Sequence, residues 1–136
     1  LYRDLALPAE RNLIQQIKLA TRKPVSLHIC GNATPVLPAM TTSDADVLEL
    51  DHAVNLQDAC RIVGPDIALW GNLNPVAVLA QGTPERVTAE SLTLLQAARS
   101  CGHSRFILSS GCTLAVETPH PNLDALMAAP RRRGKL

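Results

Sequence analysis

The chain has 136 residues, of which 46% are hydrophobic and 18% charged, and its formal net charge is +1. This composition is typical of one globular domain with its own core. The near-zero charge and the single Trp, Tyr and Phe argue against a nucleic-acid binder, which needs a basic surface and stacking rings. No apolar run approaches the roughly 20 residues of a membrane span, and no signal-peptide pattern opens the chain. We therefore expect a cytoplasmic protein that binds neither nucleic acid nor membranes.

Short apolar segments predict four strands, and amphipathic or well-capped segments between them predict helices. Thr83 is a good N-cap, and Pro84 suits the first position of the helix that follows. In chain order, we expect a helix over residues 10–22, a strand Val25–Ile29, a strand Asp46–Leu50, a short helix from Asn55 closed by Gly64-Pro65, a strand Asp66–Trp70, a helix from Thr83 to Ser100, a strand Arg105–Ser109 and a last helix from near Asn122.

Strands that alternate with helices predict βαβ units and a parallel sheet. Two architectures fit this order: an open doubly wound sheet, or half of a (β/α)8 barrel. In both, functional groups collect at the carboxyl ends of the strands. Those ends read HICGN, LELDH, LWGN and SSGC, all with polar or metal-capable side chains, whereas the opposite ends are typical of plain turns. The sequence therefore predicts a functional site at the carboxyl edge.

His28 and Cys30 lie two residues apart at the end of the first predicted strand. Side chains at i and i+2 of a strand point to the same face, so these two are expected to point toward one place. Asp51 ends the second strand, with Glu49 on its face, and Cys112 follows the fourth. An imidazole, two thiolates and a carboxylate form a reasonable tetrahedral zinc set. The strand ends therefore predict a metal site.

The alternative is that these residues are ordinary core residues, because buried cysteines are common and a lone H-x-C motif is a weak signal. Cys60 and Cys101 are expected to be core residues of this kind, and His52, His103 and His120 to be loop or surface residues. The wide spacing of the four cysteines favours reduced thiols over disulfides. Three ligand types on three strands make the metal site the stronger interpretation.

Five segments carry a resemblance over roughly residues 5–129: HICGN, ADVLELD, WGNLNPVAVLAQGTPERV, ILSSGC and TPHPNLDAL. In this order and spacing the chain resembles the C-terminal half of the uroporphyrinogen decarboxylase superfamily. The H-x-C motif with the distant Cys of SGC is similar to the zinc motif of its cobamide-dependent methyltransferases, which include the methylcobamide:coenzyme M methyltransferases. The resemblance implies an α/β fold, the C-terminal half of a (β/α)8 TIM barrel, as a single partial domain over residues 1–136.

The resemblance implies that His28, Cys30 and Cys112 are zinc ligands. Asp51 then falls on a fourth, exchangeable ligand, with Glu49 as the alternative. The implied reaction moves a methyl group between a corrinoid and a small thiol or another small donor or acceptor, as in methanogenesis or one-carbon metabolism. The co-substrate is a methylcobamide, free or carried by a corrinoid protein. The direction of transfer stays open.

The chain departs from the family in three places. GNLNP stands where relatives often have GNxDP, which leaves Asn72 and Asn74 as candidate cofactor-binding residues and Asn74 as a helix cap. The first half of the barrel is absent, so we expect a piece of a longer protein whose open sheet edges pair with the missing half or with a second copy. A basic tail is expected over residues 130–136, with Pro130 ending the last helix early.

Two other functions stay open. A metal-free decarboxylase that acts on a tetrapyrrole would need basic residues at the barrel mouth, whereas the predicted strand ends offer His, Cys, Asp and Asn but no Arg. A catalytically incomplete half-barrel would hold zinc only as a structural ion, or not at all. A folded chain without zinc would favour these alternatives, whereas about one zinc ion per chain would make a methyl-transfer assay the next test.

Overall fold

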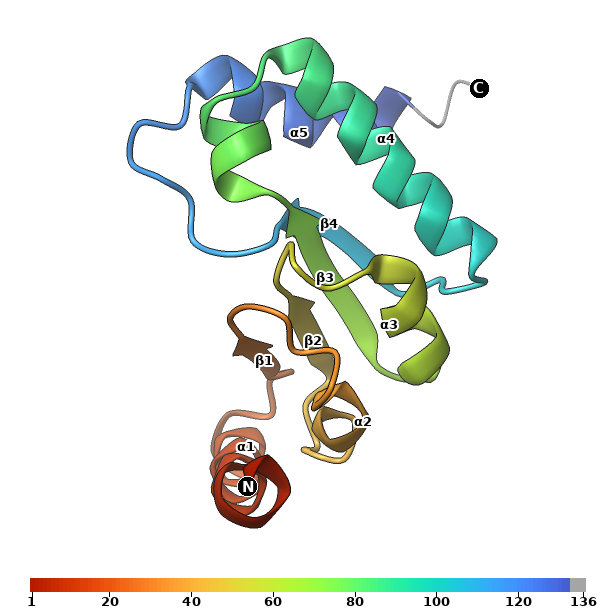
Figure 1. Ribbon diagram of the computed structural model, residues 1–136. Coiled ribbons are helices and arrows are strands. Elements are labelled where there is room, and N and C mark those ends of the chain that lie inside the picture. Colours follow the sequence, from red (N-terminus) through yellow and green to blue (C-terminus); the bar gives the residue numbers. More distant parts are fainter. Residues whose placement is uncertain (133–136) are drawn as a thin grey trace.

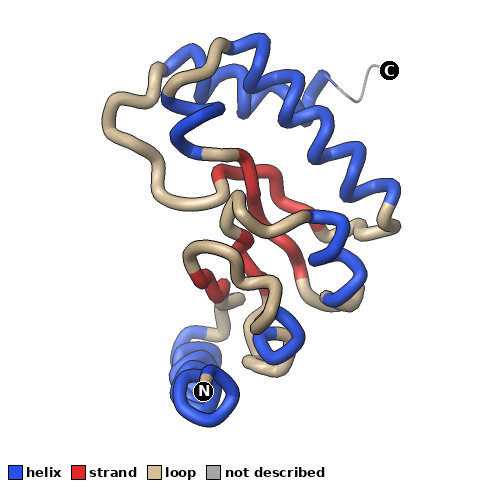
Figure 2. The backbone as a smooth tube through the Cα atoms, in the orientation of Figure 1, coloured by secondary structure: helices blue, strands red, loops and turns tan. Residues whose placement is uncertain are grey.

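A computed structural model describes residues 1–132 of the chain. Four parallel strands form one sheet in the order β1-β2-β3-β4. The strands are β1 (Ser26–Ile29), β2 (Val47–Leu50), β3 (Ala68–Leu73) and β4 (Phe106–Ser110). The helices are α1 (Leu7–Thr21), α2 (Leu37–Met40), α3 (Leu56–Ile62), α4 (Pro84–Ser100) and α5 (His120–Arg132), with π-helical segments η1 (Tyr2–Ala6) and η2 (Pro75–Ala80). Strands alternate with helices along the chain, which confirms the predicted partial (β/α) barrel (Figures 1 and 2).

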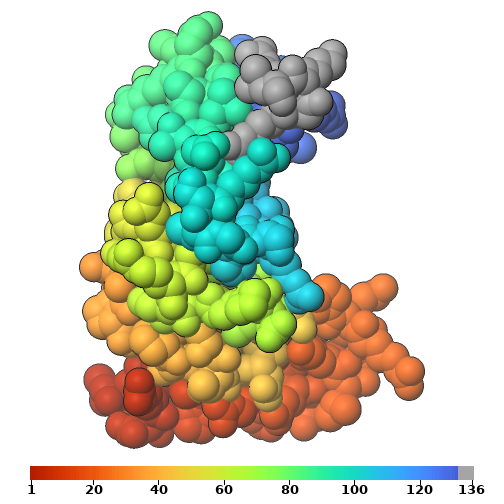
Figure 3. Space-filling view, turned by 90° about the vertical axis from the view of Figure 1, so that its right-hand side faces the viewer, coloured from red at the N-terminus to blue at the C-terminus, as the bar shows by residue number. Residues whose placement is uncertain are grey.

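The register of the sheet brings the carboxyl ends of the strands to one edge. His28 of β1 pairs with Glu49 of β2, which pairs with Trp70 of β3. Trp70 pairs in turn with Ile107 of β4. Because all four strands are parallel, the loops that follow them leave from the same edge of the sheet (Figure 1). The molecule is hollowed on the side where the blue segment around β4 lies at the surface (Figure 3).

Two apolar clusters hold the helices against the sheet. The larger one joins β2 and β3 to α2 and α3 through the fully buried Leu48, Leu69, Leu37 and Ala59. The smaller one joins the end of β3 to η2, α4 and α5, and its buried members are Leu73, Val78, Leu79, Val87 and Leu126. Burial of this apolar area is the main force that fixes the strand ends, and with them the site. Within residues 1–132, no helix is both long and apolar enough to cross a lipid bilayer.

Local capping explains where two helices begin. Thr83 Oγ1 accepts a hydrogen bond from the Arg86 N–H at 3.3 Å, so α4 begins at Pro84 as predicted. The helix ends at Ser100, which also agrees with the prediction. Asn55 Oδ1 accepts one from the Asp58 N–H at 3.1 Å at the start of α3.

The last helix differs from its prediction, because α5 continues through Pro130 to Arg132. Pro130 falls in the final turn, where it removes a single backbone hydrogen bond, and the preceding Ala129 is completely buried. Packing therefore outweighs the helix-breaking tendency of proline. Residues 130–132 of the expected basic tail thus belong to α5, and residues 133–136 lie outside the described part of the chain.

Asp46 ties α1 to the start of the sheet. Its carboxylate accepts hydrogen bonds from Lys18 Nζ at 2.8 Å and from the Val25 N–H at 2.9 Å. Burial acts to raise the pKa of Asp46, but the hydrogen bonds from Lys18 and Val25 outweigh it and hold the pKa below its ordinary value. A carboxyl whose pKa falls on folding stabilises the fold at neutral pH, and this contribution is lost as the pH falls through the folded-state pKa.

We expect Asp46→Asn to lower the free energy of unfolding by about 1 kcal/mol at neutral pH, because Lys18 loses a charged, solvent-screened partner. The difference from the wild type should shrink as the pH falls below the ordinary carboxyl pKa of about 4 and through the lower pKa of the folded state. Urea denaturation at neutral and at acidic pH measures both values. Glu90→Gln, which breaks the surface pair with Arg86, is the matched control and should have a smaller effect. Equal differences for Asp46→Asn at both pH values would contradict this assignment.

Candidate metal centre

An imidazole and a thiol lie together at the carboxyl edge of the sheet, from His28 in β1 and from Cys30 directly after β1. His28 Nε2 lies 3.3 Å from Cys30 Sγ, and His28 Nδ1 lies 3.1 Å from the backbone carbonyl oxygen of Glu49. Because a carbonyl can only accept, we assign the proton to Nδ1, which leaves the lone pair of Nε2 facing the sulfur. A backbone carbonyl that holds the far nitrogen is the usual support of a metal-binding imidazole.

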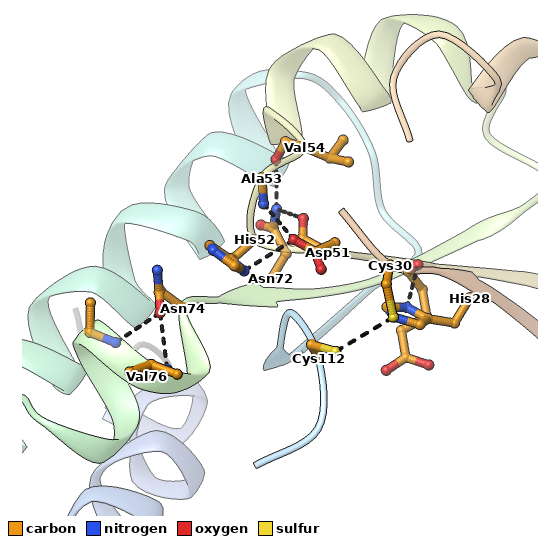
Figure 4. Close-up of polar contacts among 12 residues, drawn as sticks. His28, Cys30, Asp51, His52, Ala53, Val54, Asn72, Asn74, Val76 and Cys112 are labelled. Carbon is orange, nitrogen blue, oxygen red and sulfur yellow. Dashed lines mark hydrogen bonds and ion pairs between the residues drawn. The ribbon is translucent and has the colours of Figure 1, made fainter. Parts of the chain in front are cut away.

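Cys112 reaches the same place from the loop that follows β4. Its Sγ lies 3.8 Å from Cys30 Sγ (Figure 4). The preceding Gly111 donates its N–H to the Leu73 carbonyl at 2.7 Å. A Cβ atom on Gly111 would collide with the backbone of His52, so only glycine permits this close approach of the two loops. Gly111 therefore sets the position of Cys112.

The three donor atoms have a spacing that fits zinc. His28, Cys30 and Cys112 offer ligand atoms that all lie within 4.8 Å of one another. In a tetrahedral site with Zn–S about 2.3 Å and Zn–N about 2.1 Å, two sulfurs lie about 3.8 Å apart and sulfur and nitrogen about 3.6 Å apart. The Sγ–Sγ distance of 3.8 Å and the Sγ–Nε2 distance of 3.3 Å come close to both values. Among the described residues, no other group of His, Cys, Asp or Glu has such a spacing.

The electrostatic surroundings favour a cation. The hydrogen bond and charge of Cys112 raise the pKa of the Cys30 thiol, and the carboxylates of Asp51 and Glu49 add to the shift. Neighbouring negative charge disfavours a second anion unless a positive charge lies between the groups. A divalent cation at this place would reverse the balance and favour both thiolates.

Asp51 lies beside the three donors, but the structure does not bring it into their group. Its side chain is buried, with the Oδ1 atom 2.8 Å from the Ala53 N–H and 3.0 Å from His52 Nδ1 (Figure 4). Burial acts to raise the pKa of Asp51, but hydrogen bonds from the N–H groups of Ala53 and Gly31, with the nearby imidazoles, outweigh it and lower the pKa. Asp51 is therefore ionised at neutral pH. Glu49, the alternative, supplies its backbone carbonyl to His28.

Asn72 and Asn74 hold the scaffold around the site. The Asn72 amide donates hydrogen bonds to the carbonyl oxygens of Asp51 at 3.1 Å and Val54 at 2.7 Å. Asn74 Oδ1 accepts from two N–H groups in the first turn of η2, at 3.0 and 2.8 Å, and so caps this segment (Figure 4). The Asn72 contacts fix the loop that carries Asp51, and the Asn74 contacts fix the start of η2. A role of either amide toward a cofactor stays a prediction.

Two contributors to the site were not predicted from the sequence. His52 is an exposed loop residue, as expected, but its pairing with the buried Asp51 carboxylate was not predicted; its side chain is 40% exposed. The adjacent Asp-His pair at a strand end was the available signal. The backbone N–H of Gly31, which lowers the pKa of Asp51, carries no sequence signal at all.

Known proteins resemble this chain over nearly its whole length. The family model for uroporphyrinogen decarboxylase (URO-D) matches residues 1–133. The chain is 36% identical to the methylcobamide:CoM methyltransferase MtbA of Methanosarcina mazei over 93% of this chain and 35% of that protein. It is 32% identical to the uroporphyrinogen decarboxylase of Gloeobacter violaceus over 89% of this chain and 33% of that protein.

A solved structure of a methyltransferase from Methanosarcina mazei shares the fold. Its TM-score is 0.77 at 25% sequence identity, over 91% of this chain and 35% of that chain. The chain thus spans about a third of the length of the relatives it matches. Both the family model and these relatives cover nearly all of the described residues. The chain therefore belongs to the uroporphyrinogen decarboxylase family.

Proposed function

We propose that the protein is a zinc-dependent methyltransferase that moves a methyl group between a corrinoid and a small thiol or other small donor or acceptor. The observation that carries this proposal is the group of three donor atoms within 4.8 Å of one another, contributed by His28, Cys30 and Cys112. Relatives with methyltransferase names support it. They include the methylated-thiol–coenzyme M methyltransferase of Methanosarcina mazei, which is 30% identical over 94% of this chain.

In this proposal His28, Cys30 and Cys112 hold the zinc ion. Bound there, zinc would lower the pKa of a substrate thiol and favour its thiolate at neutral pH. The Glu49 carbonyl keeps the imidazole in the metal-binding tautomer, as its 3.1 Å contact with His28 Nδ1 indicates. Asp51 is proposed as the exchangeable fourth ligand, with Glu49 as the alternative.

The methyl transfer from cobalt to sulfur needs no oxidant, reductant or other reactant. The thiolate sulfur forms a bond to the methyl carbon of a methylcobamide, and the cobalt–carbon bond breaks. Its electron pair stays on cobalt, so that Co(III) becomes Co(I) and the thiol becomes a thioether. The carboxyl edge of the barrel would orient the two reactants and exclude water. The partners are then a corrinoid protein or free cobamide, a small thiol, and the missing barrel half or a second copy that completes the barrel.

Decarboxylation of a tetrapyrrole is the second candidate, because uroporphyrinogen decarboxylases stand among the relatives at 32% identity. The two reactions leave different products from the same preparation. We therefore propose to incubate the zinc-loaded chain with methylcobalamin and 2-mercaptoethanesulfonate, and separately with uroporphyrinogen. We expect the absorption spectrum of methylcobalamin to disappear, and this loss should require both the thiol and Cys112. Decarboxylated porphyrinogen would favour the second candidate. The absence of both products from a zinc-loaded chain would contradict catalysis by this chain.

Asp51→Asn is expected to lower the zinc affinity about 10-fold, because an amide is a poorer ligand than a carboxylate. Competition with a chromophoric chelator measures the affinity, and thermal unfolding of the metal-free protein reports any general loss of stability. Glu49→Gln, in the strand that Asp51 directly follows, is the matched control. If only Glu49→Gln weakens zinc binding, Glu49 takes the role proposed for Asp51. Unchanged affinity and turnover in Asp51→Asn would remove the carboxylate from the site.

A further inference from the structure

The two sulfurs of the metal centre lie close enough to react with each other. Cys30 Sγ and Cys112 Sγ are 3.8 Å apart, and both cysteines are free thiols (Figure 4). A disulfide bond is about 2.05 Å long, so the sulfurs need to approach by only about 1.8 Å to form one. Besides metal binding, this pair is therefore placed for thiol–disulfide exchange.

The two cysteines differ in how firmly their backbone is held. Cys112 follows Gly111, which is packed so closely against the backbone of His52 that a Cβ atom would not fit. Cys30 follows the last residue of β1, and the space beside the next residue, Gly31, is open to a distance of 4 Å. Rotation about the Cα–Cβ bond of Cys30 also moves its sulfur without any shift of the backbone. Cys30 is therefore the partner that closes the gap.

The two thiols also differ in their access to solvent. Cys30 is exposed, whereas Cys112 is half-buried. A small molecule in solution therefore meets Cys30 first, and attack by an accessible thiolate is the first step of exchange. The other two cysteines lie outside this site. Cys60 in α3 packs on the main apolar cluster, and Cys101 is exposed at the end of α4, so its predicted place in the core is wrong.

We propose that Cys30 and Cys112 form a reversible disulfide in the metal-free chain, by exchange with a small-molecule disulfide. The Cys30 thiolate attacks the small disulfide, forms a mixed disulfide and releases one small thiol. The Cys112 thiolate then attacks the Cys30 sulfur and releases the second small thiol. The protein thiols are oxidised by two electrons, and the small disulfide is reduced to two thiols, which carry the two protons that the protein has lost.

The disulfide and a metal ion compete for the same two sulfurs. Oxidation removes both thiolates from the donor group and leaves only the imidazole of His28. We expect the oxidised chain to bind zinc more than about 100-fold more weakly than the reduced chain. Zinc bound to both sulfurs should in turn protect them from exchange, because its bonds use the electron pairs that attack requires. This competition rests on the proposed zinc site, whereas the disulfide itself does not.

The test uses the full wild-type chain and a variant with Cys60→Ser and Cys101→Ser, in which only Cys30 and Cys112 can react. Each protein, metal-free or loaded with zinc, is treated with oxidised glutathione at about pH 8, alkylated without reduction, digested and mapped by mass spectrometry. Chelator competition measures the zinc affinity before oxidation, after oxidation and after reduction with dithiothreitol. Cys112→Ser in the same background is the control for the second step.

We expect a peptide pair linked through Cys30 and Cys112 in both metal-free proteins, and slower linkage in the zinc-loaded samples. Dithiothreitol should break the link and restore the zinc affinity. In the control with Cys112→Ser, Cys30 should carry glutathione as a stable mixed disulfide, because the thiol that displaces it is absent.

The disulfide is overturned if both cysteines of the folded, metal-free wild type stay reduced or each carries glutathione. It is also overturned if the linked pair forms only in urea, since the native contact would then play no part. Linkage at an equal rate with zinc bound would overturn the competition. A reduced chain that takes up no zinc would contradict the proposed function instead, and the metal-free samples would still decide whether the disulfide forms.

Discussion

Cys112→Ser is expected to abolish stoichiometric zinc binding, with a loss of affinity greater than about 100-fold. The Cys112 sulfur lies 3.8 Å from that of Cys30, the separation expected of two thiolates on one zinc ion, and a serine hydroxyl is neither anionic at neutral pH nor soft. Elemental analysis of the purified chain should give about one zinc ion in the wild type and almost none in the variant. Cys30→Ser should behave in the same way.

Cys60→Ser is the matched control for this experiment, because it removes a thiol at the opposite end of the sheet. It should leave the zinc content unchanged, since Cys60 lies in α3 and is not one of the three donors. If Cys60→Ser removes zinc as completely as Cys112→Ser does, the wrong thiols have been identified. A folded wild-type chain without zinc would favour a decarboxylase-like or a catalytically incomplete protein.

Gly111→Ala is expected to weaken zinc binding about 10-fold or more, although it changes no ligand. The added methyl group would meet the backbone of His52, so the loop after β4 must move and carry Cys112 away from Cys30. The hydrogen bond from the Gly111 N–H to the Leu73 carbonyl, now 2.7 Å, would lengthen with it. Chelator competition measures the zinc affinity, and circular dichroism reports whether the fold is kept.

Gly64→Ala is the control for Gly111→Ala, because a methyl group at Gly64 meets no atom within 4 Å. It should leave the zinc affinity unaltered. If the two alanine variants bind zinc equally well, the close approach at Gly111 does not determine where Cys112 lies. A weakened site in Gly111→Ala with an intact fold would establish Gly111 as a positioning residue.

The parts of the fold predicted correctly are those with strong local signals. Four apolar segments became strands with ends shifted by a few residues, and the Thr83-Pro84 start placed α4 correctly. The short α2 and η2 were not predicted, because segments of a few residues carry too little periodicity. Pro130 was misjudged because tertiary packing of the neighbouring Ala129 decides that turn.

The site was predictable to the extent that strand topology determines it. Side chains at the carboxyl ends of parallel strands meet at one edge, which is why His28, Cys30 and Cys112 come together. The surroundings of Asp51 were not predictable, because they depend on backbone N–H groups of Gly31 and Ala53 that any residue could supply. Hydrogen bonds of this kind leave no trace in side-chain patterns.

The contact between Cys30 and Cys112 has a mechanical consequence, because the two sulfurs follow the outermost strands of the sheet. In a flat sheet of four strands, β1 and β4 would lie about 14 Å apart, at about 4.8 Å per step. Their sulfurs are 3.8 Å apart, so the curl of the sheet and the loop after β4 together close this gap. An ion held by both would act as a cross-link that fixes the curvature, and part of its binding energy would become folding energy. Removal of this ion by a strong chelator would then also lower the stability of the curved sheet.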